Sequence, residues 1–210
     1  NAMATEDLQA LSSAQVRALS STQVSALTTG QIVALSTAQV AALSNTQVAS
    51  LTSAQLNAMA SDDLKALTTA QVKALTSTQL GALTSTQVAL METADIAALA
   101  TDLVNQLSSG AIAALTSSQV RALSSAQLNA LTSTQLRAMK TADVAALSTA
   151  QVSQLSAAQV ALLSTAQVVG LGTAQVRALG TAQVAALTSA QLNAMATEDL
   201  QALSSAQVRA

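Results

Sequence analysis

The stretch Leu11-Ser12-Ser13-Ala14-Gln15-Val16-Arg17-Ala18 recurs, with small changes, from Met3 to Ala210 without an insertion or a deletion. The chain of 210 residues is therefore built from 26 consecutive octads. Counted from its Leu, the octad has Leu or Met at the first position and Val, Leu or Ile at the sixth in every copy. Ala holds the eighth position in 20 copies, and Gln or Asp holds the fifth in 24. A strict internal period of this kind indicates a repeat array.

A short helix that restarts in every octad fits this period best. One continuous helix is excluded, because an apolar stripe with a period of eight would slip around the helix by about 80° per octad. A simple strand places the first and sixth positions on opposite faces. Val16 and Leu19 lie three residues apart and would share one face of a helix. The sequence predicts an all-α solenoid, or superhelix, of very short capped helices, one per octad, with a β-solenoid as the alternative.

Two positions compete for the cap at the start of each helix. Ser or Thr at the third position is a strong N-cap candidate, because its oxygen can accept a hydrogen bond from an unpaired amide. In the second frame, Ser12 is the cap and forms a capping box with Gln15, with Leu11 and Val16 as the hydrophobic staple. We expect the third position, because the second also holds Ala, Glu or Lys without a change of phase.

The charges support the helical interpretation. Acids near the start and bases near the end of a segment suit the helix dipole, and a β-solenoid predicts no such asymmetry. All ten acids occupy the second, fourth or fifth position: Glu6, Asp7, Asp62, Asp63, Glu92, Asp95, Asp102, Asp143, Glu198 and Asp199. Seven of the eight bases occupy the seventh: Arg17, Lys65, Lys73, Arg121, Arg137, Arg177 and Arg209. Lys140, at a second position, departs from the pattern.

The composition argues against several classes of function. The chain has no His, Cys, Pro or aromatic residue, and its net charge is −2. Catalysis by His or Cys, disulfides and Cys/His metal sites are therefore impossible. Without a basic stripe or an aromatic platform we expect no nucleic-acid binding. No apolar run reaches the ~20 residues that a membrane span needs, and no signal peptide is seen. We expect no enzyme, with no catalytic or cofactor-binding residue and no small-molecule substrate.

Residues 1–210 form one continuous octad array in the sequence. Residues 1–18 are identical to residues 193–210, which gives a higher-order period of 192 residues, or 24 octads. We interpret the chain as a slice of a longer array. The period permits 2, 3, 4, 6 or 8 octads per superhelical turn, among other values. Two octads, at residues 99–106 and 107–114, lack the Gln or Asp of the fifth position, so a local change of curvature or simple drift of the repeat is expected there.

Three columns of residues suggest candidate functions. Five octads combine Met with Asp. Paired carboxylates are part of what a calcium site needs, but no ligand loop accompanies them. Duplication of one ancestral octad with acids at the start of its helix explains them as well, and we expect no metal site. These octads contain Met3 and Asp7, Met59 and Asp63, Met91 and Asp95, Met139 and Asp143, and Met195 and Asp199. The Gln column predicts either a ladder of side-chain amides between successive coils or partly exposed helix starts. The Ser/Thr rows could match an ice lattice, although Ser and Thr interchange freely.

The octads Leu51–Ala58 and Leu35–Ala42 resemble repeats of very large secreted bacterial proteins that are described as adhesion-related or haem-utilisation-related exoproteins. The resemblance covers essentially the whole chain and transfers no functional residue. It implies a cell-surface or extracellular filamentous role.

These observations favour a non-enzymatic structural repeat that forms an extracellular filament, a stalk or an adhesin spacer. We expect its partners to be further copies of the same array. The alternative is a solenoid binding module, such as a surface or ice adhesin or a segment stiffened by calcium. Such a module would cluster variable residues on one face, whereas the seventh position varies without an obvious run.

Overall fold

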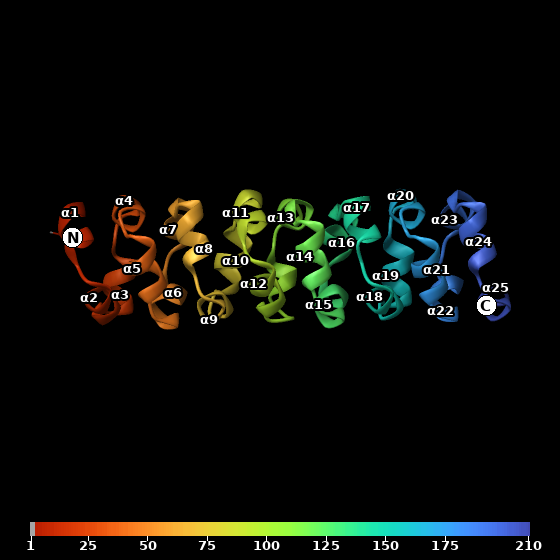
Figure 1. The fold of residues 1–210 in the computed structure, drawn as a ribbon, viewed down its shortest axis with the longest axis horizontal. Helices are drawn as coiled ribbons and strands as arrows, with labels where there is room; N and C mark the ends of the chain where they lie inside the picture. Colours follow the sequence, from red (N-terminus) through yellow and green to blue (C-terminus); the bar gives the residue numbers. More distant parts are fainter. Residues whose placement is uncertain (1–2) are drawn as a thin grey trace. The chain divides into compact units, whose positions relative to one another are not determined.

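A computed structural model describes residues 3–210, and this part of the chain contains 25 α-helices, one 3₁₀ helix and no strand. The helices follow one another at intervals of one octad (Figure 1). The prediction of an all-α array with one short helix per octad is confirmed, and the β-solenoid alternative is wrong. The chain divides into two compact units, Asn1–Ala114 and Leu115–Ala210. The octads continue through both units, and the single array with a 192-residue period stays a prediction.

The first unit contains α1 (Thr5–Ala10), α2 (Ser13–Ala18), α3 (Ser21–Ser25), α4 (Thr29–Val33), α5 (Thr37–Ala42), α6 (Asn45–Ser50), α7 (Ser53–Ala58), α8 (Ser61–Ala66), α9 (Thr69–Lys73), α10 (Ser77–Ala82), α11 (Ser85–Leu90), α12 (Thr93–Ala98), η1 (Val104–Gln106) and α13 (Ser109–Ala114). The second unit contains α14 (Ser117–Ala122), α15 (Ser125–Ala130), α16 (Ser133–Ala138), α17 (Thr141–Ala145), α18 (Thr149–Ser153), α19 (Ala157–Leu162), α20 (Thr165–Val169), α21 (Thr173–Ala178), α22 (Thr181–Ala185), α23 (Ser189–Ala194), α24 (Thr197–Ala202) and α25 (Ser205–Val208).

The N-cap is the second position of the octad, so the expectation of a cap at the third position is wrong. Ser12 has extended backbone angles, and its hydroxyl accepts from the Gln15 amide, whose side chain accepts in turn from the Ser12 amide. The second position varies in two ways. Where it is Ala, Glu or Lys, the fifth position is Asp or Leu, and helices α8, α12, α17 and α24 begin without a side-chain cap hydrogen bond. Where it is Gly, the fifth-position Gln still holds the N-cap amide. Gly172 and Gly180 still donate their amides to Gln175 and Gln183, at 2.8 and 2.6 Å.

Many of the helices end in an extended residue at the first position of the next octad, whereas α3, α4, α9, α17, α18, α20, α22 and α25 end earlier, at a residue with right-handed helical angles. Leu19 has φ −62° and ψ 143°, and its amide donates to the Val16 carbonyl at 3.2 Å. None of the described residues has a positive φ, so the chain turns without the left-handed residue that often ends a helix. The turn directs the Leu side chain into the core.

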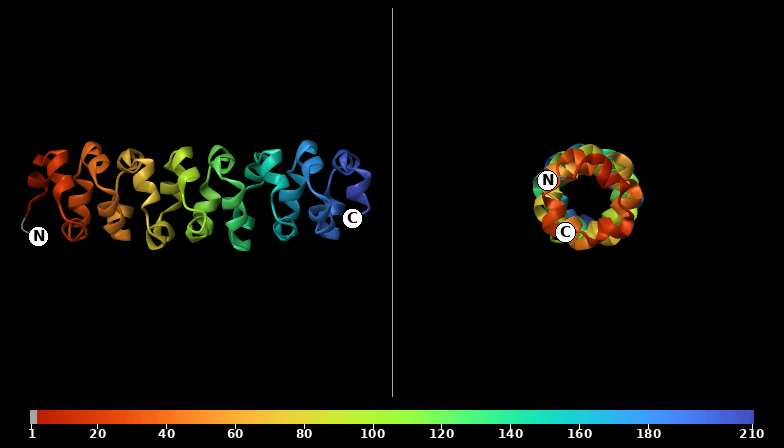
Figure 2. Two further views of the ribbon diagram at one scale, coloured as in Figure 1. Left: turned by 90° about the horizontal axis from the view of Figure 1, so that it is seen from below. Right: turned by 90° about the vertical axis from the view of Figure 1, so that its left-hand side faces the viewer.

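The core of each unit consists of the sixth and first positions. Val40 and Leu43 are 0 and 5% exposed, and the same two columns are buried along most of the chain. Within each unit a helix packs on the helix three places later, as α2 does on α5 and α18 on α21. Within each unit successive helices wind around an axis (Figure 2). The packing of helices three places apart and hydrogen bonds to carbonyls 28 to 31 residues earlier give three to four octads per turn, which we call a coil.

The two irregular octads depart from the repeat in different ways. In residues 99–106 the α-helix is replaced by a turn and η1, with Val104 still buried. In residues 107–114 a regular helix forms, and the Ser108 hydroxyl still accepts from the Ala111 amide at 3.0 Å. The division between the two units follows directly at Ala114.

Candidate functional site

The Gln at the fifth position joins each coil to the preceding one. In α6, Gln47 Oε1 accepts from the amide of the N-cap Ser44 at 2.7 Å. Its Nε2 donates to the carbonyls of Val16 and Leu19, at 3.0 and 2.8 Å, in the coil before. A carboxamide has both an acceptor and two donors, so one side chain caps its own helix and binds the neighbouring coil. We call this arrangement the glutamine clamp.

The clamp recurs along both units with buried side chains. It binds carbonyls 28 to 31 residues earlier in the clamps of Gln39, Gln47, Gln55, Gln71, Gln79, Gln151, Gln167, Gln175, Gln183, Gln191 and Gln207. The expectation of a Gln column bonded inside the stack is confirmed. Its partners are backbone groups, however, and not the side-chain amides that a ladder would need. The separation of 28 to 31 residues also places the turn between three and four octads.

The clamp binds a carbonyl that the helix leaves unpaired. The sixth-position carbonyl, such as Val16, already accepts from the amide that closes its helix. The first-position carbonyl, such as Leu19, lies outside the helix and accepts from the Gln of the next coil. Since an unpaired backbone group away from water costs about 1–3 kcal/mol, the Gln column provides hydrogen bonds that the apolar columns cannot.

The Asp octads replace the clamp with a different contact. Three of these buried carboxylates accept a hydroxyl from the preceding coil: Asp95 from Thr69 at 2.8 Å, Asp143 from Ser117 at 2.8 Å and Asp199 from Thr173 at 3.0 Å. An ionised Asp has no donor. The carbonyls of Leu67 and Leu171, which a Gln would bind, accept no hydrogen bond within residues 3–210.

Lys140, the base that departs from the charge pattern, compensates for the missing clamp in its octad. Its Nζ donates to the Leu115 carbonyl at 3.1 Å, which is the carbonyl 28 residues before Asp143. The same Nζ lies 3.9 Å from Asp143 Oδ2, a buried oxygen without a hydrogen-bond partner. The sequence shows that Lys140 departs from the seventh-position pattern of the other bases. It does not show which carbonyl Lys140 binds, because that depends on the number of octads per turn.

The calcium alternative predicts the carboxylate ligands in the five Met/Asp octads. The structure buries Asp63, Asp95, Asp143 and Asp199 and leaves Asp7 exposed, with the Ala4 amide donating to Asp7 at 3.0 Å. Among the residues that the structure describes, no group of three acidic side chains could hold a metal ion. The Met/Asp octads therefore supply acids singly or in pairs, and calcium binding stays a prediction.

The variable seventh position also contributes to contacts between coils. Asn57 and Asn129 donate from Nδ2 to the carbonyls of Ala82 and Gln154, at 3.0 and 2.8 Å. Arg137 Nε reaches the Leu162 carbonyl at 3.3 Å. Each acceptor lies 25 residues later, in the following coil. The second-position hydroxyls of the Ser/Thr rows, such as Ser12 and Thr68, are occupied as helix caps, so only part of these rows is available to a surface ligand.

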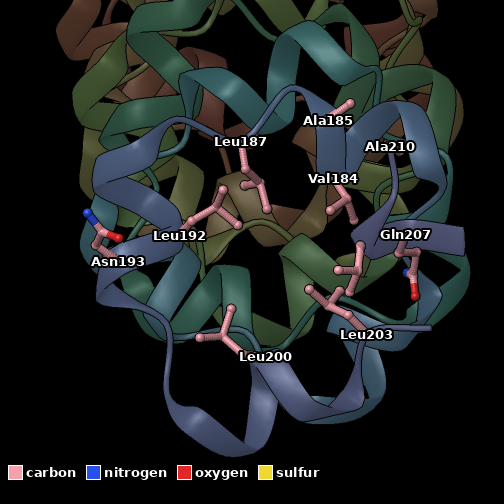
Figure 3. A pocket seen from close by; sticks show the side chains of 10 residues that line it. Val184, Ala185, Leu187, Leu192, Asn193, Leu200, Leu203, Gln207 and Ala210 are labelled. Carbon is pink, nitrogen blue, oxygen red and sulfur yellow. The ribbon is translucent and has the colours of Figure 1, made fainter. Parts of the chain in front are cut away.

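An apolar hollow of about 580 Å³ lies on the coil Val184–Ala210 (Figure 3). The side chains of Val184, Leu187, Leu192, Leu200 and Leu203 point into it, whereas Asn193 points away. Leu200 and Val208 are 39 and 68% exposed, although they occupy the sixth position, which is almost fully buried in other coils. The hollow is lined by the same apolar columns, the first and sixth positions, that form the core elsewhere in the chain.

Comparison with known families identifies the repeat. The ALTTAQ repeat matches residues 1–37, 32–61, 56–91, 88–124, 112–141, 136–173 and 168–197. Residues 66–71, Ala-Leu-Thr-Thr-Ala-Gln, carry the six letters of that name. The chain belongs to the ALTTAQ repeat family. The predicted octapeptide array is thereby confirmed, while the secreted, adhesion-related context stays a prediction.

The structure explains the ALTTAQ pattern in physical terms. Leu67 packs in the core, Thr68 caps α9, and Gln71 closes the capping box and reaches the Leu43 carbonyl at 2.7 Å. No curated protein matches the chain. No helix among the described residues is both long and apolar enough to cross a membrane.

Proposed function

We propose that this ALTTAQ array is a non-enzymatic structural element, a spacer, stalk or filament segment on the cell surface or outside the cell, which associates with further copies of the same array. The glutamine clamp is the observation that supports this proposal best. It uses the most regular polar residue of the octad to bind one coil to the next, so the repeat serves to extend the array.

The contacts of the seventh position favour this proposal over a binding module. A binding surface would use its most variable column for a ligand. Here Asn57, Asn129 and Arg137 direct side-chain donors to the next coil. The variable column thus contributes to the stack itself, as a structural array requires.

Pulling the 210-residue chain from its two ends tests the mechanical role. Because each coil contacts only its neighbours, we expect lengthening in successive steps and recovery on relaxation. Each step should be somewhat shorter than about 90–100 Å, the extended length of roughly 28 residues, because the folded coil already spans part of that length. The variant Gln71→Leu should lower the force of the weakest step, whereas the exposed Lys73→Ala should not. A single rupture of the whole chain would contradict an array of coils.

Immunogold labelling of intact cells of the organism that encodes the chain tests the location. Label on unpermeabilised cells is expected, with loss of label after mild external proteolysis. Label seen only after permeabilisation would contradict the extracellular role and leave the mechanical role standing.

A further inference from the structure

Three consecutive octads interrupt the Gln column, so one coil lacks the glutamine clamp completely. Their fifth positions are Asp95, Leu103 and Ala111. An ionised Asp has no donor, and the side chains of Leu and Ala have no polar atom. Asp95 instead accepts from the Thr69 hydroxyl at 2.8 Å. Every other interruption after Gln31 is a single octad with Gln on both sides, so the loss of three clamps in a row distinguishes this coil.

The coil before it contains the acceptors that the missing clamps would bind. They are the first-position carbonyls of Leu67, Leu75 and Leu83, which accept no hydrogen bond from any residue that the structure describes. In the coil of residues 171–194, by contrast, three successive clamps bind such carbonyls, each at 2.7 Å. Two coils of the same repeat are therefore joined in one place with the clamps and in another without them.

Apolar packing and a close approach of the backbone hold the contact between residues 67–90 and residues 91–114, which we call the clamp-free junction. In this junction α9 packs on α12, α10 on η1 and α11 on α13. Gly110 lies so close to α11 that a Cβ atom there would be 3.1 Å from Ser85 Oγ. Since apolar packing is non-directional, these two coils can shift or part without first breaking a row of buried hydrogen bonds.

We propose that the clamp-free junction is a flexible joint, at which neighbouring coils open more often than at the clamped junctions of the array. This inference goes beyond the proposed function, because it concerns where the array moves and does not rest on a role outside the cell. In a stack of coils, a local opening breaks only the contacts of one junction. The coil of residues 67–90 stays bound to the coil before it through the clamps of Gln71 and Gln79.

Hydrogen exchange of the 210-residue chain, followed by mass spectrometry, tests the joint. Amides of α12 and α13 should exchange about ten- to a hundredfold faster than those of α21 and α22, which lie in the coil with three successive clamps. The comparison uses α-helices only, so the 3₁₀ turn of residues 99–106 does not decide it. As a further control, α17 also begins without a side-chain cap hydrogen bond but is a single interruption, and it should exchange more slowly than α12. Equal or slower exchange in α12 and α13 would overturn the proposal and leave the structural role of the array standing.

Asp95→Gln tests the cause, because it exchanges a hydroxyl contact for a clamp on the Leu67 carbonyl. Exchange of α12 and α13 should slow by about three- to tenfold. Asp63→Gln is the matched control, since Asp63 is a buried acid of the same column with Gln on both sides, and it should not change exchange in α12 or α13. Equal slowing by both variants would contradict a joint at this junction. An unchanged rate in an Asp95→Gln chain of native helix content would overturn the proposal as well, because the missing clamps would not be the cause of the opening.

Discussion

At the scale of single residues, the Gln column decides whether one octad binds the next coil. Leu and Val bury apolar surface, but they cannot pair the amide of the N-cap or the carbonyl at the first position. Gln is long enough to reach both groups, and its carboxamide has an acceptor for the amide and donors for the carbonyl. Asp is one methylene shorter and lacks a donor, which explains why the Asp octads use hydroxyls from the coil before.

Gln71→Leu isolates this role. Gln71 is 2% exposed, accepts from the Thr68 amide at 2.6 Å and donates to the Leu43 carbonyl at 2.7 Å. Leu fills similar space but leaves both backbone groups unpaired, so we expect a loss of about 1–3 kcal/mol in the free energy of unfolding. Urea denaturation followed by circular dichroism measures it. Lys73→Ala, exposed in the same helix, should stay within about 0.5 kcal/mol, and equal losses in both variants would contradict the clamp.

At the scale of the helix, most of the element could be predicted from the octad and one detail could not. The spacing of Val16 and Leu19 and the placement of charges were enough to predict a helix in each repeat. The sequence predicts the cap one residue too late, because the second position also holds Ala, Glu and Lys, which are poor caps. At Gly172 and Gly180 the following Gln still holds the cap amide. At Ala60, Glu92, Lys140 and Ala196 the helix forms without a side-chain cap hydrogen bond, so the packing of the octad is enough to start it.

The α17 octad offers a test of a compensated helix start. Lys140→Ala removes the donor to Leu115 and leaves the buried Asp143 oxygen without its neighbouring ammonium. Lys140 is 55% exposed, so solvent screens the ion pair, and we expect a loss of about 1–2 kcal/mol in unfolding free energy, mostly from the unpaired groups.

Adding Asp143→Gln to Lys140→Ala should recover most of that loss, because the glutamine clamp is then restored in this octad. Thermal and urea denaturation of the single and double variants measure both effects. A double variant that is less stable than Lys140→Ala would show that the Asp octads cannot be converted to the clamp.

The α8 octad predicts a dependence on pH. Burial raises the pKa of Asp63 above its ordinary value of 3.8, the hydrogen bond with the Ala60 backbone opposes the shift, and the charge of Asp62 adds to it. A raised pKa in the folded state means that Asp63 favours folding when it is protonated and that this contribution is lost as the pH rises through the folded pKa.

Asp63→Gln should therefore stabilise the chain at pH 7 by about 1 kcal/mol, through loss of a buried charge and gain of a clamp. The gain should shrink as the pH falls toward 3.8, where the wild-type carboxyl is protonated. Urea midpoints from pH 3 to 8 measure it. Asp102→Asn, an exposed acid, serves as the control, and a gain independent of pH would contradict the role of burial.

At the scale of the molecule, the sequence predicts that octads stack but not which octads meet. The 24-octad period suggested whole numbers of octads per turn, whereas the clamps lie 28 to 31 residues from their acceptors, between three and four octads. The pitch depends on small angles at each extended Leu, such as Leu19, and these angles are not encoded in residue type alone. The partner of Lys140 and the acceptors of the Gln column were therefore beyond sequence reasoning.

The stacking of each helix on the helix three places later predicts how stability depends on length. Residues 115–138 contain three octads, so no helix in that fragment has a stacking partner, and isolated six-residue helices do not persist in water. Residues 115–170 add the packing of α14 on α17, of α16 on α19 and of α17 on α20, and residues 115–210 complete the second unit. We expect circular dichroism to show an unfolded first fragment, a partly helical second and a fully helical third, with the melting temperature rising along the series.

Helicity of the longest fragment should not change with a calcium chelator if the clamps and the apolar columns hold the coils. Equal stability of the two longer fragments would contradict stabilisation by stacking, and helix that forms only with calcium would assign the Asp octads a role in binding metal.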